Sequence, residues 1–257
     1  MTQKSDGALA LEALRLPSRS ERHDGSWAAL LDAASEPYRV AGRFAYFFAR
    51  GKLRTDPVFR TLLRAGLLAG RSQVLDLGCG QGLLAAWMQA ASTCHARGAW
   101  PRGWPPPPQL QSIRGIELMA RDVARARQAL GARLQVQHGD LREVPFGHAD
   151  AIVVLDVLHY LAPDCQLEVL RRIHAALPRG GVLLLRVGDA HHGLRFRITQ
   201  AADRLILLAR GHGWVKTHCR SLDAWRAVLD QCGFDGTAVW MSQGTPFANV
   251  LLIGRAR

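Results

Sequence analysis

The sequence predicts an α/β fold with a doubly wound sheet of seven strands, mostly parallel, with one antiparallel edge strand and helices on both faces. Two observations predict it. From residue 71 onward, short apolar segments alternate with longer segments of helical periodicity, as in parallel sheets whose strands are joined by helices. A glycine-rich turn, VLDLGCGQG at 74–82, follows the first apolar segment. Such turns bring the backbone close to a ligand at the carboxyl edge of a sheet.

The individual elements follow from this alternation. We expect strands at 73–77, 112–117, 133–137, 149–155 and 181–187, and helices at about 81–91, 119–130 and 164–177. A further helix near 221–232 precedes two strands at 234–240 and 248–254. Because a short loop joins these last two strands, we expect an antiparallel hairpin at the sheet edge.

Three regions surround or interrupt this domain, which we place at 71–257. Residues 1–25 are predicted to be a flexible N-terminus, and 26–70 a helical cap or lid. In the cap, Ser26 and Asp56 are the expected N-caps of two helices, and Gly70 is the expected terminator of the second. Four consecutive prolines in the segment 93–112 prevent helix formation, so we interpret that segment as a surface insertion.

The charge and the cysteines limit the compartment and the partners. A formal net charge of +12 favours acidic partners: nucleic acid, an anionic membrane face or an acidic carrier protein. The arginines are scattered, which argues against nucleic acid. Five cysteines without a CxxC pair predict a reducing, cytoplasmic location. No apolar stretch approaches the ~20 residues of a membrane span.

The glycine turn itself indicates which ligand it holds. Its spacing is GxGxG, whereas the dinucleotide fingerprint is GxGxxG. Asp76 precedes the turn, and its carboxylate would repel a pyrophosphate but attract a ligand with an ammonium group. Glu117 ends the second predicted strand, where a carboxylate can accept hydrogen bonds from both ribose hydroxyls. These features favour a cationic nucleoside over a dinucleotide.

At this point the chain resembles the class I S-adenosylmethionine-dependent methyltransferases, which have a Rossmann-like sheet. VLDLGCGQG is similar to their first motif, and four further segments are similar to later motifs in the right order. These segments are GIELMARDVARAR (115–127), QHGDLREVPF (137–146), ADAIVVLDVLHYL (149–161) and LPRGGVLLLRVGDA (177–190).

The resemblance implies S-adenosyl-L-methionine as cofactor and S-adenosyl-L-homocysteine as product. It implies that the turn surrounds the methionine part, that Glu117 binds the ribose and that Asp140 binds the adenine amino group. Asp156 would position cofactor or acceptor and needs a partner, for which we expect Arg186. The implied cofactor-binding residues are Asp76, Gly78, Cys79, Gly80, Gly82, Glu117, Leu118, Asp140, Leu141 and Asp156.

The candidate catalytic residues follow the fourth and fifth predicted strands. His159 is either a general base or part of the pocket wall, and Tyr160 and Asp156 lie beside it in the sequence. Asp189 and the pair His191 and His192 follow the next strand; for this pair we favour a solvated loop. No metal site is expected, because the histidines lack partners at metal-ligand spacing.

The absence of one sequence motif narrows the class of molecule that could accept the methyl group. No Asn-Pro-Pro-Tyr-like tetrapeptide follows the fourth strand, so a small-molecule acceptor is favoured over a nucleic-acid base. The segments FARGKLRTDPVF, LDVLHYL, LRVGDA and GTPFANVLL resemble bacterial methyltransferases found with aryl polyene or fatty-acid-like synthesis genes. That resemblance implies a hydroxylated aromatic acceptor, or an aryl or acyl unit on an acidic acyl carrier protein. An RNA methyltransferase and a non-catalytic cofactor-binding partner protein remain alternatives, and the oligomeric state stays open.

Overall fold

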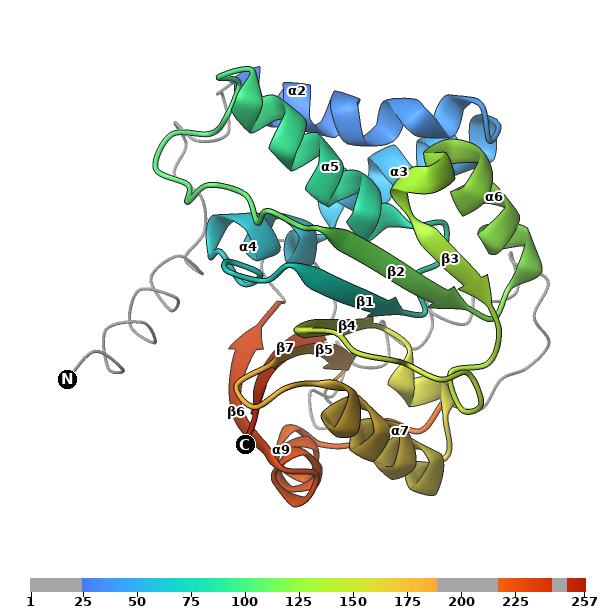
Figure 1. Cartoon of the computed structure of the whole chain (residues 1–257), viewed down its shortest axis with the longest axis vertical. Coiled ribbons are helices and arrows are strands. Elements are labelled where there is room, and N and C mark those ends of the chain that lie inside the picture. The colour runs from blue at the N-terminus through green and yellow to red at the C-terminus, as the bar shows by residue number, and fades with distance from the viewer. Residues whose placement is uncertain (1–24, 189–216, 242–248) are drawn as a thin grey trace. The chain divides into compact units, whose positions relative to one another are not determined.

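The computed structural model describes residues 25–188, 217–241 and 249–257 (Figure 1). Its sheet has seven strands in the order β3-β2-β1-β4-β5-β7-β6, which confirms the predicted Rossmann-like architecture. The chain divides into two compact units, one ending at Asp140 and the other beginning at Leu141. Almost all of the predicted flexible N-terminus, and the candidates Asp189, His191 and His192, lie outside the described residues.

The first unit contains three parallel strands and the helices that join them. The strands are β1 (Gln73–Leu77), β2 (Ser112–Glu117) and β3 (Gln135–His138), paired in the order β3-β2-β1. The helices are α5 (Leu83–Ala96) and α6 (Ala120–Leu130). Four of the five β1 residues are buried, as expected for a strand with covered faces. The predicted bounds of β1 and β2 are confirmed.

The cap (residues 26–70) precedes β1 and belongs to the same unit. It contains α2 (Gly25–Ser35), the 3₁₀ turn η2 (Glu36–Arg39), α3 (Arg43–Thr55) and α4 (Pro57–Arg64). The N-cap at Asp56 is confirmed, since its side chain accepts a hydrogen bond from Val58 N at 3.1 Å. The N-cap at Ser26 is wrong: Ser26 lies inside α2. The end at Gly70 is also wrong, because α4 stops at Arg64, two residues before Gly66 adopts a φ of +58°.

The second unit contains the other four strands. The strands are β4 (Ala151–Leu155), β5 (Val182–Gly188), β6 (Phe234–Trp240) and β7 (Asn249–Ala256), and the helices are α7 (Pro163–Ala176) and α9 (Leu222–Gln231). β4 and β5 are parallel, whereas β7 runs antiparallel to both β5 and β6. The predicted terminal hairpin is therefore confirmed, with the reversed strand β7 between β5 and β6.

The proline-rich insertion begins later than predicted. Helix α5 continues to Ala96 because its buried side chains, Cys94 among them, extend the apolar face past residue 91. After the helix, Trp100 and Trp104 pack edge to face with ring centroids 5.9 Å apart. Trp104 also lies 6.2 Å from Trp27 of α2. The insertion is therefore anchored to the cap by aromatic contacts.

Two general properties complete the fold. All five cysteines are free thiols, as expected from the absence of a CxxC pair. Within the described ranges, none of the helices has both the length and the apolar character that a bilayer crossing requires.

Candidate functional site

The glycine turn (residues 78–82) has a backbone that only glycine adopts without strain. Gly78, Gly80 and Gly82 have φ values of +72°, +56° and +82°. At Gly82 there is also no room for a side chain, since a Cβ atom would lie 2.6 Å from Leu134 Cδ2. The alternating glycines therefore reflect both the shape of the turn and the close packing beneath it.

Glu117, at the end of β2, fixes this turn. One carboxylate oxygen accepts a hydrogen bond from Gly80 N and the other from Met119 N, each at 2.8 Å. Since a carboxylate oxygen has two acceptor positions, both oxygens keep capacity for a ligand hydroxyl. The structure thus brings Glu117 and Gly80 into direct contact.

Asp76 is the second carboxylate of this region, and it is buried with 5% exposure. Burial, and secondarily the nearby charge of Glu117, raises the pKa of Asp76 to about 8. No donor from the described part of the chain is hydrogen-bonded to its carboxylate. A buried carboxylate in this state gains from a cationic partner. The residues present therefore fit a ligand that carries an ammonium group.

The other candidate cofactor-binding residues of the first unit, Cys79, Leu118 and Asp140, differ in how exposed their side chains are. Cys79 is 7% exposed, and a Cβ atom on Gly115 of β2 would lie 2.6 Å from its Sγ. Burial, assisted by the charges of Asp76 and Glu117, raises the pKa of the Cys79 thiol, which favours its protonated form. Leu118 is 56% exposed, and Asp140 is half-buried. An exposed leucine directly after Glu117 provides an apolar surface for a flat ring.

In the second unit, Leu141 is held by a residue that sequence reasoning missed. Arg172 of α7 donates hydrogen bonds to the carbonyls of Leu141 at 2.8 Å and Val144 at 2.5 Å. Its guanidinium also lies 4.3 Å from the centroid of the Phe146 ring. No signal near Leu141 in the sequence points to Arg172, because the contact depends on how α7 packs.

The expected partnership of Asp156 and Arg186 is confirmed. Arg186 Nε donates to Asp156 Oδ1 at 2.7 Å, and Arg186 Nη2 pairs with Asp156 Oδ2. Arg186 is 1% exposed and the Asp156 side chain 29% exposed, so Asp156 compensates a buried cation. Asp156 also has a φ of +60°, a conformation rare outside glycine that often marks a functional turn.

The loop after β4 (residues 156–161), called the β4 loop below, brings His159 and Tyr160 together. The imidazole and phenol ring centroids are 4.1 Å apart. His159 is 4% exposed. Burial lowers the pKa of His159, although Asp156 acts in the opposite direction. The imidazole is therefore neutral near pH 7, the protonation state that a general base requires.

Gln166 of α7, another residue that the sequence did not single out, holds the β4 loop in place. Its amide donates to the carbonyls of Leu158 at 3.1 Å, Leu161 at 3.0 Å and His218 at 2.8 Å. Its Oε1 accepts from Arg220 Nε at 2.7 Å. Since Gln166 is fully buried, these bonds are shielded from water.

The expectation of no metal site is not contradicted by the geometry. Among the residues that the structure describes, no group of three histidine, cysteine or acidic side chains is arranged to hold a metal ion.

Comparison with known proteins gives a family match. A family model described as "Methyltransferase domain" matches residues 48–239, which is most of the chain. Among solved structures, magnesium protoporphyrin IX methyltransferase from Synechocystis, with bound SAH, is similar in fold with a TM-score of 0.54. It is 19% identical, and the match covers 85% of this chain and 92% of that chain.

Curated relatives share a common description. Carboxy-S-adenosyl-L-methionine synthase of Chromohalobacter salexigens is 35% identical over 130 residues, covering 47% of this chain but only 43% of the relative's length. The enzyme of the same name from Photobacterium profundum is 26% identical over 215 residues, covering 73% of this chain and 80% of the relative.

Proposed function

Since the chain belongs to the family described as "Methyltransferase domain", we propose that it is a class I S-adenosylmethionine-dependent enzyme that methylates a small-molecule acceptor in the cytoplasm. The proposed acceptor is a hydroxylated aromatic compound, or an aryl or acyl intermediate attached to a carrier protein. The cofactor site we assign to the glycine turn, Asp76, Glu117, Leu118 and Asp140. The free thiols of the five cysteines support the location.

The glycine turn carries the cofactor assignment. The buried Asp76, with its raised pKa, fits the ammonium of the methionine part, and Glu117 retains acceptor capacity for the ribose hydroxyls. Leu118 supplies an exposed apolar surface for the adenine. When bound, S-adenosylmethionine supplies an electrophilic methyl group on a sulfonium. The chain's task is then to orient the nucleophile, exclude water and accept a proton.

His159 is our candidate for the proton acceptor. It is buried and neutral, and a phenol or another weakly acidic acceptor must lose a proton as the methyl group is transferred. Tyr160, whose ring lies against His159, supplies an aromatic surface suited to an aromatic acceptor. Asp156 we propose as a positioning residue, since it is paired with Arg186.

The charged and aromatic side chains of α3 favour an acceptor that is bound to a carrier protein. This helix contains four basic residues and no acidic residue. Arg50 and Lys52 pair with Asp32 and Asp56, whereas Arg43 and Arg54 are exposed. On the same helix Phe44 and Phe47 are 52% and 61% exposed. A basic surface with exposed aromatic rings suits an acidic protein that carries an apolar group.

A methyl-transfer assay tests this function. Purified protein and labelled S-adenosylmethionine would be incubated with phenolic acids, the same acids on an acyl carrier protein, and RNA. We expect label in a phenolic or carrier-bound product and production of S-adenosylhomocysteine. Label in RNA alone would contradict the proposal. Cofactor binding by calorimetry without transfer to any acceptor would favour the non-catalytic partner protein.

The curated relatives favour a second candidate function, the formation or use of carboxy-S-adenosyl-L-methionine. The matches to proteins of that name extend over as much as 73% of this chain. Mass spectrometry of the nucleoside that co-purifies with the protein separates the candidates. S-adenosylhomocysteine supports the first function and a carboxylated sulfonium supports the second, whereas S-adenosylmethionine fits both.

A further inference from the structure

A tyrosine of the cap is bonded directly to the glycine turn. Tyr38, in η2, is fully buried. Its hydroxyl donates a hydrogen bond to the backbone carbonyl of Gln81 at 3.0 Å. Gln81 lies between Gly80 and Gly82. A side chain 43 residues away along the chain therefore satisfies a backbone acceptor in the centre of the turn.

Gln81 also contacts the cap through its own side chain. The Gln81 side chain is 2% exposed, and its amide donates to the carbonyl of Ala45 in α3 at 2.9 Å. One residue of the turn thus accepts from η2 and donates to α3. If either bond were lost, a buried polar group would be left unpaired, which is costly.

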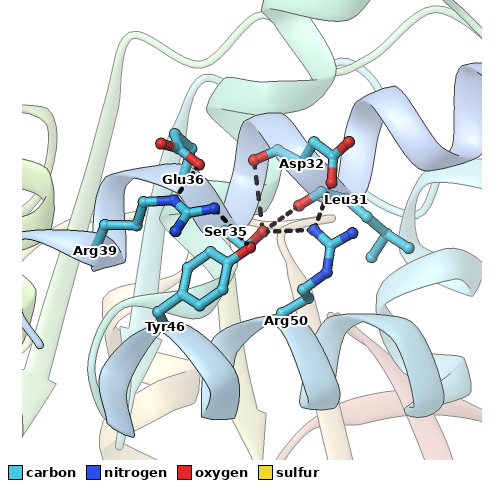
Figure 2. Close-up of polar contacts among 7 residues, drawn as sticks. All are labelled: Leu31, Asp32, Ser35, Glu36, Arg39, Tyr46 and Arg50. Carbon is cyan, nitrogen blue, oxygen red and sulfur yellow. Dashed lines mark hydrogen bonds and ion pairs between the residues drawn. The ribbon is translucent and has the colours of Figure 1, made fainter. Parts of the chain in front are cut away.

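Further polar contacts hold the cap segments that make these bonds, as Figure 2 shows. Ser35 Oγ donates to the Leu31 carbonyl at 2.7 Å and contacts Arg50 Nη1 at 3.3 Å, while Arg50 also pairs with Asp32. In η2, Arg39 bonds Glu36 at 2.7 Å and the Tyr46 hydroxyl at 3.2 Å. These bonds connect α2, η2 and α3 to one another, and none of those drawn in Figure 2 involves the glycine turn.

Tyr38 acts only as a hydrogen-bond donor here. Burial raises the pKa of its phenol, so the hydroxyl stays protonated throughout the pH range in which the protein would work. On the opposite side of the turn, Glu117 accepts from Gly80 N. The two consecutive residues Gly80 and Gln81 are therefore held from β2 and from the cap at once.

We propose that Tyr38 and Gln81 are positioning residues that keep the glycine turn in the conformation that binds the cofactor. The cap is then a fixed component of the cofactor site rather than a lid that opens and closes. This inference rests on the proposed placement of the cofactor at the turn. It assigns a role to Tyr38 and Ala45, both of which precede residue 48, where the family match begins.

Calorimetric titration with S-adenosylhomocysteine tests the inference without knowledge of the acceptor. Tyr38→Phe removes only the hydroxyl, and Gln81→Met removes the amide while keeping a long side chain. If the turn is in its binding conformation only about a tenth of the time in each variant, the apparent Kd rises about tenfold. If the parent protein does not bind S-adenosylhomocysteine, the cofactor placement and this inference are both overturned. If it binds and the variants bind equally well, only this inference is overturned.

Two matched variants separate positioning from general stability. Tyr46→Phe removes a hydroxyl from the same cap that does not contact the turn. Ser35→Ala removes a buried hydrogen bond inside the cap. Both are expected to keep the parent Kd, although Ser35→Ala lowers the melting temperature.

Amide exchange gives a second readout that a purely structural role would not produce. In Tyr38→Phe we expect faster exchange confined to Gly80 and Gly82, whose N–H groups bond Glu117 and the Cys79 carbonyl. An unchanged Kd in both Tyr38→Phe and Gln81→Met overturns the inference. It is equally overturned if Ser35→Ala weakens binding as much as Tyr38→Phe does.

Discussion

The glycine turn and the β4 loop are built by different kinds of contact. The turn obtains its shape from its own three glycines, and it is held by Glu117 at the Gly80 N–H and by Tyr38 at the Gln81 carbonyl. The β4 loop contains no glycine. Its backbone carbonyls are held by the side chain of Gln166 on α7, which in turn is bonded to Arg220.

The difference shows which of the two segments can change its sequence without changing its backbone. A turn whose glycines adopt positive φ values tolerates little change in its own residues, because a side chain at Gly82 also has no space. A loop held by side chains from other elements can change its own residues while keeping its backbone. We therefore expect variants of the turn to affect cofactor binding, and variants of the β4 loop to affect stability and turnover.

The largest effect is expected at the ion pair that begins the β4 loop. Asp156→Ala leaves Arg186, which is 1% exposed, without its bidentate partner, so the free energy of unfolding should fall by roughly 3 kcal/mol. The control Asp223→Ala breaks an exposed pair with Arg226 and should cost about 0.5 kcal/mol or less. Urea denaturation measures both, and equal losses would contradict the importance of burial.

The next effect concerns His159. If His159 accepts the acceptor's proton, His159→Ala should slow turnover about a hundredfold. Its affinity for S-adenosylhomocysteine should stay close to that of the parent protein, because His159 is not part of the turn. Calorimetry and a steady-state assay on the best acceptor measure the two quantities. Unchanged turnover would assign His159 to the pocket wall instead.

The third effect concerns Asp76. Asp76→Asn should weaken S-adenosylhomocysteine binding roughly thirtyfold, since a charge-assisted contact to the ammonium is lost. In the parent protein the affinity should increase as the pH rises from about 6 to 8, because burial raises the pKa of Asp76 to about 8 and the carboxylate is the binding form. The asparagine variant should show no such pH dependence, and calorimetry at several pH values compares the two.

Stability without cofactor should change in the opposite direction. The ordinary pKa of this carboxyl is 3.8, and in the folded protein it is about 8. Between these values the folded protein retains the proton that the unfolded chain has lost. Stability therefore falls as the pH rises through this range. Asp76→Asn should reduce that fall in thermal melts, and a variant that melts like the parent at every pH would argue against a buried, protonated Asp76.

The smallest effect is expected at Gln166. The substitution Gln166→Glu keeps an acceptor for Arg220, but the ionised carboxylate cannot donate to the carbonyls of Leu158, Leu161 and His218. The β4 loop should then open more often, and amide exchange at His218, whose N–H bonds the His159 carbonyl at 2.7 Å, should accelerate about tenfold. The control Gln89→Glu, at a solvent-exposed bond to Arg133, should change exchange only near itself.

The same difference explains how far the sequence predicted this molecule. The order of strands and helices and the glycine turn were predictable, because alternation and glycine spacing are local patterns. The partnership of Asp156 with Arg186 was also predictable, since the two residues lie near the ends of neighbouring strands and carry opposite charges, although Arg186 rather than Asp156 is the buried partner. Tyr38, Gln166 and Arg172 were not singled out, because each donates hydrogen bonds to backbone carbonyls of distant residues. Since every residue has a carbonyl, the sequence does not show which one accepts such a bond.

The contact between Cys79 and Gly115 has a practical consequence. The thiol is almost inaccessible, with a raised pKa, so an alkylating reagent can reach it only when the chain around it moves away from β2. The rate at which Cys79 is alkylated in the native protein therefore reports how often that movement occurs. Slower alkylation of Cys79 after a nucleoside is added would measure how far the ligand suppresses that movement. No engineered label is needed.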